Sequence, residues 1–177
     1  MKLLRKIRKA TAQPKERVTS NEFCHLFAEE MTGLYLLSLL LTTSPEMAER
    51  CFVTALEDCL NGVTVAKEWA HSWAKRVVIK NAIRLMAPNL RSASRKTFSI
   101  STRTNDEQRR RCEENPTIDG VLALEDFDRL VFVMSVLERY PDRDCAALLD
   151  CRREEIRTGR TRALQQIAMW NCRTERI

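Results

Sequence analysis

Arginine is concentrated near the C-terminal end of the sequence, between positions 152 and 162. Five arginines and two threonines fall in this interval: Arg152, Arg153, Arg157, Thr158, Arg160, Thr161 and Arg162. Guanidinium groups pair with phosphates and with guanine edges, and hydroxyl groups donate to phosphate oxygens. The cluster therefore predicts contact with nucleic acid, and the alternative is a solvated charged face of a helix.

A second group of cations follows two tryptophans, Trp69 and Trp73, that are four positions apart. Aromatic side chains beside a row of cations are typical of surfaces that hold the unstacked bases of a single strand. The alternative is that both indoles belong to the core and the cations to a solvated face, and the two interpretations are compatible. The residues predicted here to bind DNA are Trp69, Lys75, Arg76, Lys80, Asn81 and Arg84.

The sequence lacks the usual patterns of catalysis and metal binding. Its two histidines, His25 and His71, have no partners at zinc-ligand spacing, and neither a glycine-rich phosphate loop nor a CxxC pair occurs. The seven cysteines are therefore expected to be reduced, mostly buried thiols. We predict no enzymatic activity, no metal site, no cofactor and no small-molecule substrate.

Signals for export or membrane insertion are also missing. The basic start MKLLRKIRKA is not followed by an apolar run of signal-peptide length. The longest apolar stretch, Leu34 to Leu41, is too short to span a bilayer. We expect a cytoplasmic protein without membrane contact.

Charge alternates along the chain, although the net charge is only +6. Residues 1–18, 66–111 and 150–177 are net basic, whereas residues 22–65 and 112–149 are net acidic. An acidic scaffold thus precedes each internal basic segment. This order suits two modules that each face a polyanion.

The elements that must position these side chains are helices. Only four glycines and five prolines occur, and no sustained alternation of β-branched residues is seen. The predicted fold is all-α, with two small helical domains joined by a flexible linker. Its predicted parts are a basic tail over residues 1–18, a three-helix domain over 19–88, a linker over 89–117 and a second domain over 118–177.

Capping signals place the helices of the first domain. Ser20 or Asn21 should begin a helix that reaches about Leu41, and Ser44 caps a second helix that Asn61-Gly62 ends. The third helix should run from about Val65 to Ala87, because Pro88 is expected to stop it. The linker assignment follows from residues rich in serine, threonine and charge without an apolar period.

The second domain contains the sequence features of a helix-turn-helix. A helix with one apolar face, from Leu124 through Leu137, should end at Tyr140-Pro141. A short helix from Arg143 to Leu149, a turn at Asp150-Cys151 and a helix from Arg152 to about Asn171 should follow. Ala146 and Ile156 have the spacing that closes the crossing of two such helices. Gly159 should weaken the second helix by about 1 kcal/mol relative to alanine.

These motifs resemble those of the extracytoplasmic-function subfamily of RNA polymerase sigma factors, of which the chain looks like a divergent member. The segment DRLVFVMSVLERYPDRDCAALLDCRREEIRTGRTRAL is similar to region four, and LLLTTSPEMAERCFVTALEDCL is similar to a helix of region two. The matching positions are Arg129, Val131, Phe132, Ala146, Leu149, Ile156, Arg157, Thr158, Arg162 and Ala163 in region four and Ala48 and Glu49 in region two. The segment KRVVIKNAIRLM resembles the helix that reads the promoter's minus-ten element.

The resemblance implies a DNA-binding transcription initiation factor that binds RNA polymerase core and directs it to promoters. Promoter DNA, RNA polymerase core and an anti-sigma protein are the implied partners. The resemblance places core binding on the second helix of the first domain. The implied residues there are Glu46, Glu49, Arg50, Val53 and Glu57.

The chain departs from the family pattern on that polymerase-facing helix. Arg50, Val53 and Thr54 stand where the family has an acid and a Gln-Glu pair. One alternative is therefore a degenerate sigma-like regulator that binds DNA or a protein partner without recruiting polymerase. Another is a helical interaction domain whose acidic helices over residues 21–60 bind a partner.

Two arginines of the predicted recognition helix are given different roles. Arg157 follows the core-facing Ile156 and should point into the major groove, where it would contact a base. Arg162 lies later in the helix and should meet either a phosphate or an acid of the scaffold.

Overall fold

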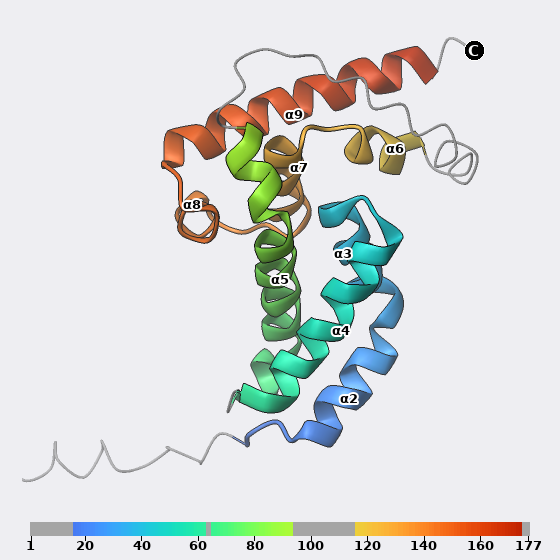
Figure 1. Ribbon diagram of the computed structural model, residues 1–177, viewed down its shortest axis with the longest axis vertical. Coiled ribbons are helices and arrows are strands. Elements are labelled where there is room, and N and C mark those ends of the chain that lie inside the picture. The colour runs from blue at the N-terminus through green and yellow to red at the C-terminus, as the bar shows by residue number, and fades with distance from the viewer. Residues whose placement is uncertain (1–15, 63–64, 94–115, 175–177) are drawn as a thin grey trace, which may run out of the picture.

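Residues that favour helices, together with a scarcity of glycine, make the described part of the chain helical almost throughout (Figure 1). The computed structural model describes residues 16–62, 65–93 and 116–174. The elements are α2 (Ser20–Glu29), α3 (Met31–Thr42), α4 (Pro45–Gly62), the 3-10 turn η1 (Lys67–Trp69), α5 (Ala70–Ala93), α6 (Pro116–Leu122), α7 (Asp126–Phe132), the π-helical turn η2 (Val133–Leu137), α8 (Asp142–Leu149) and α9 (Arg153–Thr174). The described residues contain no strand beyond an isolated bridge between Arg17 and Ala66. The predicted all-α class is confirmed.

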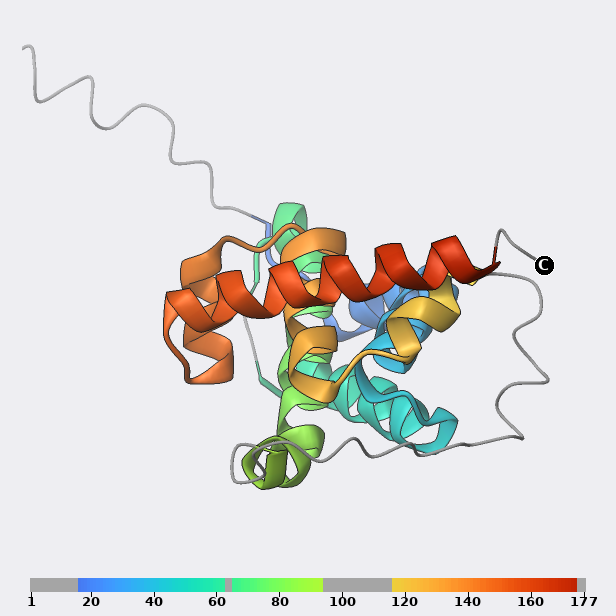
Figure 2. The same cartoon turned by 90° about the horizontal axis from the view of Figure 1, so that it is seen from above.

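The helices form two groups that lie one above the other in Figure 1. The first helix group, α2 to α5, occupies the lower part, and the second helix group, α6 to α9, occupies the upper part. α9 crosses the top of the molecule, and Figure 2 shows it running over the ends of the helices beneath it. α5 contacts α7 and α8 of the second group.

The first helix begins at Ser20, one of the two predicted positions, but its N-cap is a different residue from those predicted. Thr19, rather than Ser20 or Asn21, is the N-cap, because its hydroxyl accepts from the Glu22 backbone and the Glu22 carboxylate accepts from the Thr19 backbone. The expected single helix to Leu41 is also wrong. It divides at Glu30 into α2 and α3, which are bent by 76°.

α4 begins as its sequence predicts and packs between α3 and α5. The Ser44 hydroxyl accepts from the Met47 backbone at 3.4 Å, and Pro45 occupies the first helical position. Cys51 and Ala55 on the inner face of α4 are fully buried. The helix ends at Gly62, as expected.

α5 continues through the proline that was expected to stop it. It runs to Ala93 with Pro88 inside, so the predicted boundary of the first domain at residue 88 falls within a helix. Proline removes one backbone donor and crowds the preceding turn, but it does not reverse the chain. Leu90 to Ala93 favour helix, and the helix therefore resumes.

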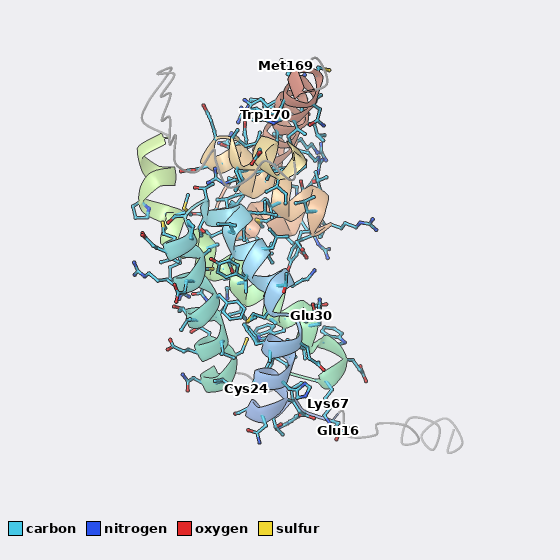
Figure 3. All side chains as sticks on the ribbon, turned by 90° about the vertical axis from the view of Figure 1, so that its right-hand side faces the viewer. Glu16, Cys24, Glu30, Lys67, Met169 and Trp170 are labelled. Atoms are coloured by element: carbon cyan, nitrogen blue, oxygen red, sulfur yellow. The ribbon has the colours of Figure 1, made fainter. Side chains whose placement is uncertain are left out.

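The end of the predicted basic tail is part of the folded chain. The Val18 backbone N–H donates to Val65 O at 2.8 Å, and the Lys67 backbone N–H donates to Glu16 O at 3.0 Å. Figure 3 shows Glu16 and Lys67 together at the end of the molecule opposite the tip of α9. Residues 1–15 of the tail and 94–115 of the predicted linker lie outside the described residues.

The predicted helix from Leu124 to Tyr140 is shorter and changes its winding. α7 begins after Glu125, whose side chain makes no capping hydrogen bond, and after Phe132 the chain enters the π-helical turn η2. A π-turn contains an additional residue, so side chains beyond it leave the predicted face. Leu137, predicted to be buried, is consequently 45% exposed.

Buried apolar residues form one cluster that includes members of both helix groups. A buried arginine also joins the groups. Arg129 of α7 donates to Leu41 O at the end of α3, at 3.4 and 3.5 Å, and to Leu124 O at 2.8 Å. Arg129 Nη2 also donates to Asp126 Oδ1 at 2.6 Å. A positive group is thereby held at the negative C-terminal end of α3.

The six cysteines in the described residues are free thiols. Cys51, Cys59 and Cys145 are buried, whereas Cys24 and Cys172 are exposed, so only half of the set is in the core. The Cys51 thiol donates to Val78 O at 3.3 Å, and burial raises its pKa to about 11. Burial likewise raises the pKa of Cys59 and of Cys145 to about 11.

No single described helix is long and apolar enough to cross a membrane; α2 and α3 reach that length and composition only as a bent pair. No group of three or more histidines, cysteines or acids that could hold a metal ion occurs within the described ranges.

Candidate nucleic-acid interface

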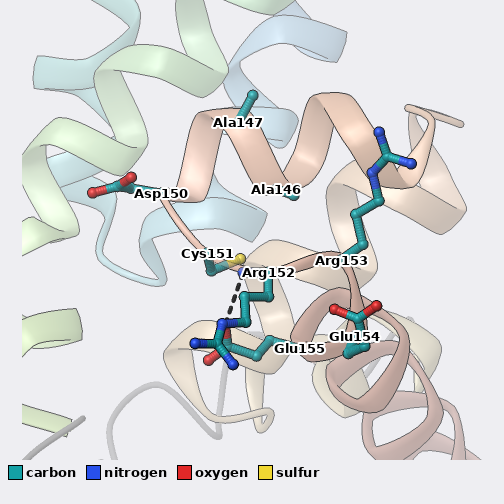
Figure 4. A pocket seen from close by; sticks show the side chains of 8 residues that line it. All are labelled: Ala146, Ala147, Asp150, Cys151, Arg152, Arg153, Glu154 and Glu155. Carbon is teal, nitrogen blue, oxygen red and sulfur yellow. Dashed lines mark hydrogen bonds between the residues drawn. The ribbon is translucent and has the colours of Figure 1, made fainter.

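The turn between α8 and α9 sets the position of the arginine-rich helix (Figure 4). Asp150 ends α8 in the left-handed conformation with φ 51°, within the turn predicted at Asp150-Cys151, and the Cys151 backbone N–H donates to Ala146 O. The Arg152 backbone N–H donates to the Glu155 carboxylate at 2.7 Å, the dashed line in Figure 4. Glu155 therefore caps the start of α9.

The crossing of α8 and α9 uses the two residues that the spacing predicted. Ala146 of α8 and Ile156 of α9 are both buried in this crossing. One turn later, Gly159 is buried where α9 passes over α7. A Cβ at this position would lie 3.1 Å from Phe127 Cε1 and 3.1 Å from Asp128 Oδ1. The glycine predicted to weaken α9 thus permits close packing of α7 against it.

The residues of α9 that were predicted to face DNA differ in how far they are exposed. Arg152 and Arg153 are exposed at its start, and Arg157 is also exposed. Arg160 is partly covered. Thr158 and Thr161 are exposed, and each hydroxyl donates to the carbonyl of the residue four positions earlier. α9 therefore presents its first turns to solvent with cations at several positions.

Asp142, which the sequence interpretation did not single out, holds two of these arginines. Its carboxylate accepts from Arg157 Nε at 3.2 Å and from Arg160 Nη1 at 2.7 Å. The two guanidinium groups, chiefly that of Arg160, lower the pKa of Asp142. The sequence feature that could have identified Asp142 is an acid in the first turn of a helix that crosses an arginine-rich helix.

Arg162 lies on an acid of the scaffold, one of its two predicted positions. Its Nε and Nη2 donate to the two oxygens of Asp128 at 2.9 and 2.6 Å. Asp128 is buried in α7, so this fork satisfies a carboxylate that has left water. The ion pair raises the pKa of Arg162. In this arrangement Arg162 fixes α9 on α7.

The cationic face of α5 is only partly the surface that was predicted. Trp69 is 64% exposed, and Lys80 and Arg84 are exposed. Asn81 is a correction, because it is buried: its Nδ2 donates to Asp58 Oδ2 at 3.0 Å and to Val77 O at 3.2 Å. Its amide connects α4 and α5, so it does not face solvent.

Lys75 and Arg76 lie where α5 faces the second helix group. Lys75 Nζ donates to both oxygens of Glu138, at 2.9 and 3.2 Å. A cavity of about 670 Å³ lies beside this contact. Its lining includes Trp69, Trp73, Arg76 and Tyr140, and therefore combines aromatic rings with cations. Trp73 is partly buried, and its indole N–H has no partner among the described residues.

The residues implied in polymerase binding form one exposed face of α4. Their spacing repeats about every turn, and all of them are exposed: Glu46, Glu49, Arg50, Val53 and Glu57. Val53 places an apolar side chain, 46% exposed, at the centre of this face. Thr54 beside it is partly covered.

In comparison with known proteins, no family model and no curated protein matches the chain.

Proposed function

We propose that this protein is a sigma-like transcription initiation factor that binds RNA polymerase core and directs it to promoter DNA. The observation that carries the proposal is the joining of α8 to α9 by a tight turn, with Arg152, Arg153 and Arg157 exposed on the first turns of α9. A helix presented in this way fits the major groove, with its N-terminal residues toward base edges and phosphates. In the proposal, α8 and α9 form the helix-turn-helix.

The first helix group supports the same function through two surfaces. The exposed face of α4 would bind core polymerase, and the exposed cations of α5 with Trp69 would follow a melted strand. The proposed partners are promoter DNA, RNA polymerase core and an anti-sigma protein, in the cytoplasm and without chemistry of the protein's own. We treat the two groups as modules joined through the predicted linker.

Run-off transcription tests the proposal directly. Purified core polymerase is supplied with fragments of the source genome, with and without the full-length protein. We expect discrete transcripts only when the protein is present. Arg157→Ala should abolish the preference among fragments, whereas Arg143→Ala, which removes an exposed arginine from α8, should not.

A second candidate is favoured by Arg50 and Val53 on the polymerase-facing surface of α4. In this alternative the protein is a degenerate regulator that binds DNA or a protein partner and does not recruit polymerase. Co-elution with core polymerase separates the two candidates. Binding of DNA without co-elution and without transcripts would favour the degenerate regulator.

Limited trypsin digestion tests the proposed modules. If residues 94–115 connect two separable units, two stable fragments should accumulate. A single resistant species that spans both helix groups would remove the two-module interpretation. The buried Arg129 contact then provides the reason that the groups stay docked.

A further inference from the structure

Asp142 has an unusual position for an acid in a surface predicted to face phosphates. It is the first residue of α8, and its carboxylate reaches arginines 15 and 18 positions later in the chain. Its side chain is only 23% exposed, so the carboxylate is held between α8 and α9. A single acid here restrains two cations of the adjoining helix.

The two arginines keep different capacities after this pairing. Arg157 uses Nε alone, and its two terminal nitrogens have no partner among the described residues. Arg160 donates from both terminal nitrogens, with Nη1 at 2.7 Å from Oδ1 and Nη2 at 3.5 Å from Oδ2. Arg157 can therefore donate a second fork to a planar acceptor, whereas the fork of Arg160 is already occupied.

We propose that Asp142 is a positioning residue that sets the sequence specificity of α9, an inference that rests on the proposed DNA-binding function. By holding Nε of Arg157, it directs the two terminal nitrogens toward a base edge such as the O6 and N7 atoms of guanine. By pairing with Arg160, Asp142 also leaves that guanidinium less available to bind a DNA phosphate.

The first effect favours discrimination, whereas the second lowers the affinity for every sequence. A long side chain loses rotamer freedom when it docks, and Arg157 has lost much of it already in the folded protein. This preorganisation strengthens the contact with the correct base. The carboxylate also repels the DNA backbone at every sequence alike, so it lowers both affinities by the same factor. The ratio of specific to non-specific affinity therefore rises through the preorganisation of Arg157 alone.

The experiment compares Asp142→Asn with Asp144→Asn in the full-length protein. Asp144 lies in the same first turn of α8, and its substitution changes the charge equally. Its ion-pair partner is the adjacent Arg143, not an arginine of α9. Both variants are titrated on a preferred duplex, selected from random sequences with the parent protein, and on a scrambled duplex at several salt concentrations.

Asp142→Asn should lower the ratio of the two affinities by about tenfold and raise the affinity for the scrambled duplex. It should also steepen the slope of log affinity against log salt by about one, because Arg160 becomes available to a phosphate. Asp144→Asn should leave the ratio unchanged. In an Arg157→Ala background, Asp142→Asn should no longer alter the ratio, which a merely structural role of Asp142 would not explain.

Two outcomes would overturn the inference in distinguishable ways. If the parent prefers one duplex and both acid variants keep its ratio, Asp142 has no role in specificity although the protein reads DNA. If the parent binds no duplex at any salt concentration, the proposed function itself falls and the inference with it. Circular dichroism of each variant establishes that the helices persist.

Discussion

The buried hydroxyls of the first helix group and the buried ionic side chains of the second satisfy their hydrogen bonds in opposite ways. In the first group, the buried hydroxyls of Ser38 and Thr42 donate to carbonyls four residues earlier in the same helix, at 2.9 and 2.8 Å. In the second group, the buried polar residues Asp128 and Arg129 are ionic. Apart from Asp126 in the same helix, their partners lie on α3, on α9 and in the loop before α7. The first arrangement is local and neutral, whereas the second depends on how helices meet.

The contrast predicts which substitutions should destabilise the protein most. A hydroxyl that returns to its own helix can be lost without leaving another buried group unpaired, since the carbonyl keeps its helical bond. A buried guanidinium that joins several elements cannot be removed without leaving acceptors unsatisfied. The geometry of the second group, including its arginine-bearing helix, is therefore determined by charge pairs.

Replacement of Arg129 should have the largest effect and is the strongest test of this contrast. Arg129→Met removes the donor to Leu41 O and Leu124 O and should lower the free energy of unfolding by about 3 kcal/mol. Ser38→Ala in the first group should change it by less than about 1 kcal/mol. Urea unfolding of both variants makes the comparison, and equal losses would break it.

Alanine at two glycines should give effects of opposite sign in the two groups. At Gly159, a Cβ would be 3.1 Å from both Phe127 and Asp128. Overpacking outweighs the gain in helix propensity there, so Gly159→Ala should destabilise the protein by about 1 kcal/mol.

At Gly33 of α3, the nearest atom is the end of a flexible side chain, Glu30 Oε2, at 3.7 Å. Gly33→Ala should therefore stabilise the protein by up to about 1 kcal/mol. Thermal unfolding of the two variants measures both signs. If Gly159→Ala also raised the melting temperature, α7 and α9 would not require their close approach.

The ion pair between Lys75 and Glu138 should couple the two groups weakly. Both side chains are partly covered and their closest approach is 2.9 Å. A double-mutant cycle with Lys75→Ala and Glu138→Ala should give a coupling free energy of about 0.5 to 1 kcal/mol that decreases with salt. Zero coupling would mean that Arg129 and the apolar cluster alone hold the groups together.

The smallest effect concerns pH at the edge of the first group. The Lys67 ammonium, with Thr19 as a second donor, lowers the pKa of Glu22 from 4.5 to about 2. Because this pKa is lower in the folded protein, the contribution of Glu22 to stability is present above pH 4.5 and is lost as the pH falls toward 2. NMR titration of the Glu22 carboxyl measures the shift, and Lys67→Met should return the value toward 4.5.

Local signals in the sequence predicted a large part of this architecture. Ser44-Pro45 marked the start of α4, Asp150-Cys151 marked the turn after α8, and Ala146 with Ile156 marked the crossing of α8 and α9. Each of these depends on residues within a few turns of one another. Periodicity and capping are sufficient for features of this kind.

The features that sequence reasoning missed are breaks in helices and pairings between distant residues. The bend at Glu30 and the π-turn at Val133 interrupt segments whose apolar periodicity predicted regular, continuous helices. Asn81 is of a residue type that is usually exposed, but here its amide is buried and donates to the carboxylate of Asp58 on α4. The pairing of Asp142 with Arg157 likewise joins residues 15 positions apart, and no spacing rule identifies it.

The rate at which a disulfide reagent modifies the buried thiols reports how often the surrounding helices open. Only a thiolate attacks a disulfide reagent, and a pKa of about 11 leaves few thiolates at Cys51, Cys59 or Cys145 at neutral pH. Because these three side chains are also buried, their modification requires the surrounding helices to separate, whereas Cys24 and Cys172 are exposed and do not need that step. The modification rates of Cys51 and Cys59 in α4 would measure the opening of the first helix group. The modification rate of Cys145 in α8 would measure the opening of the second.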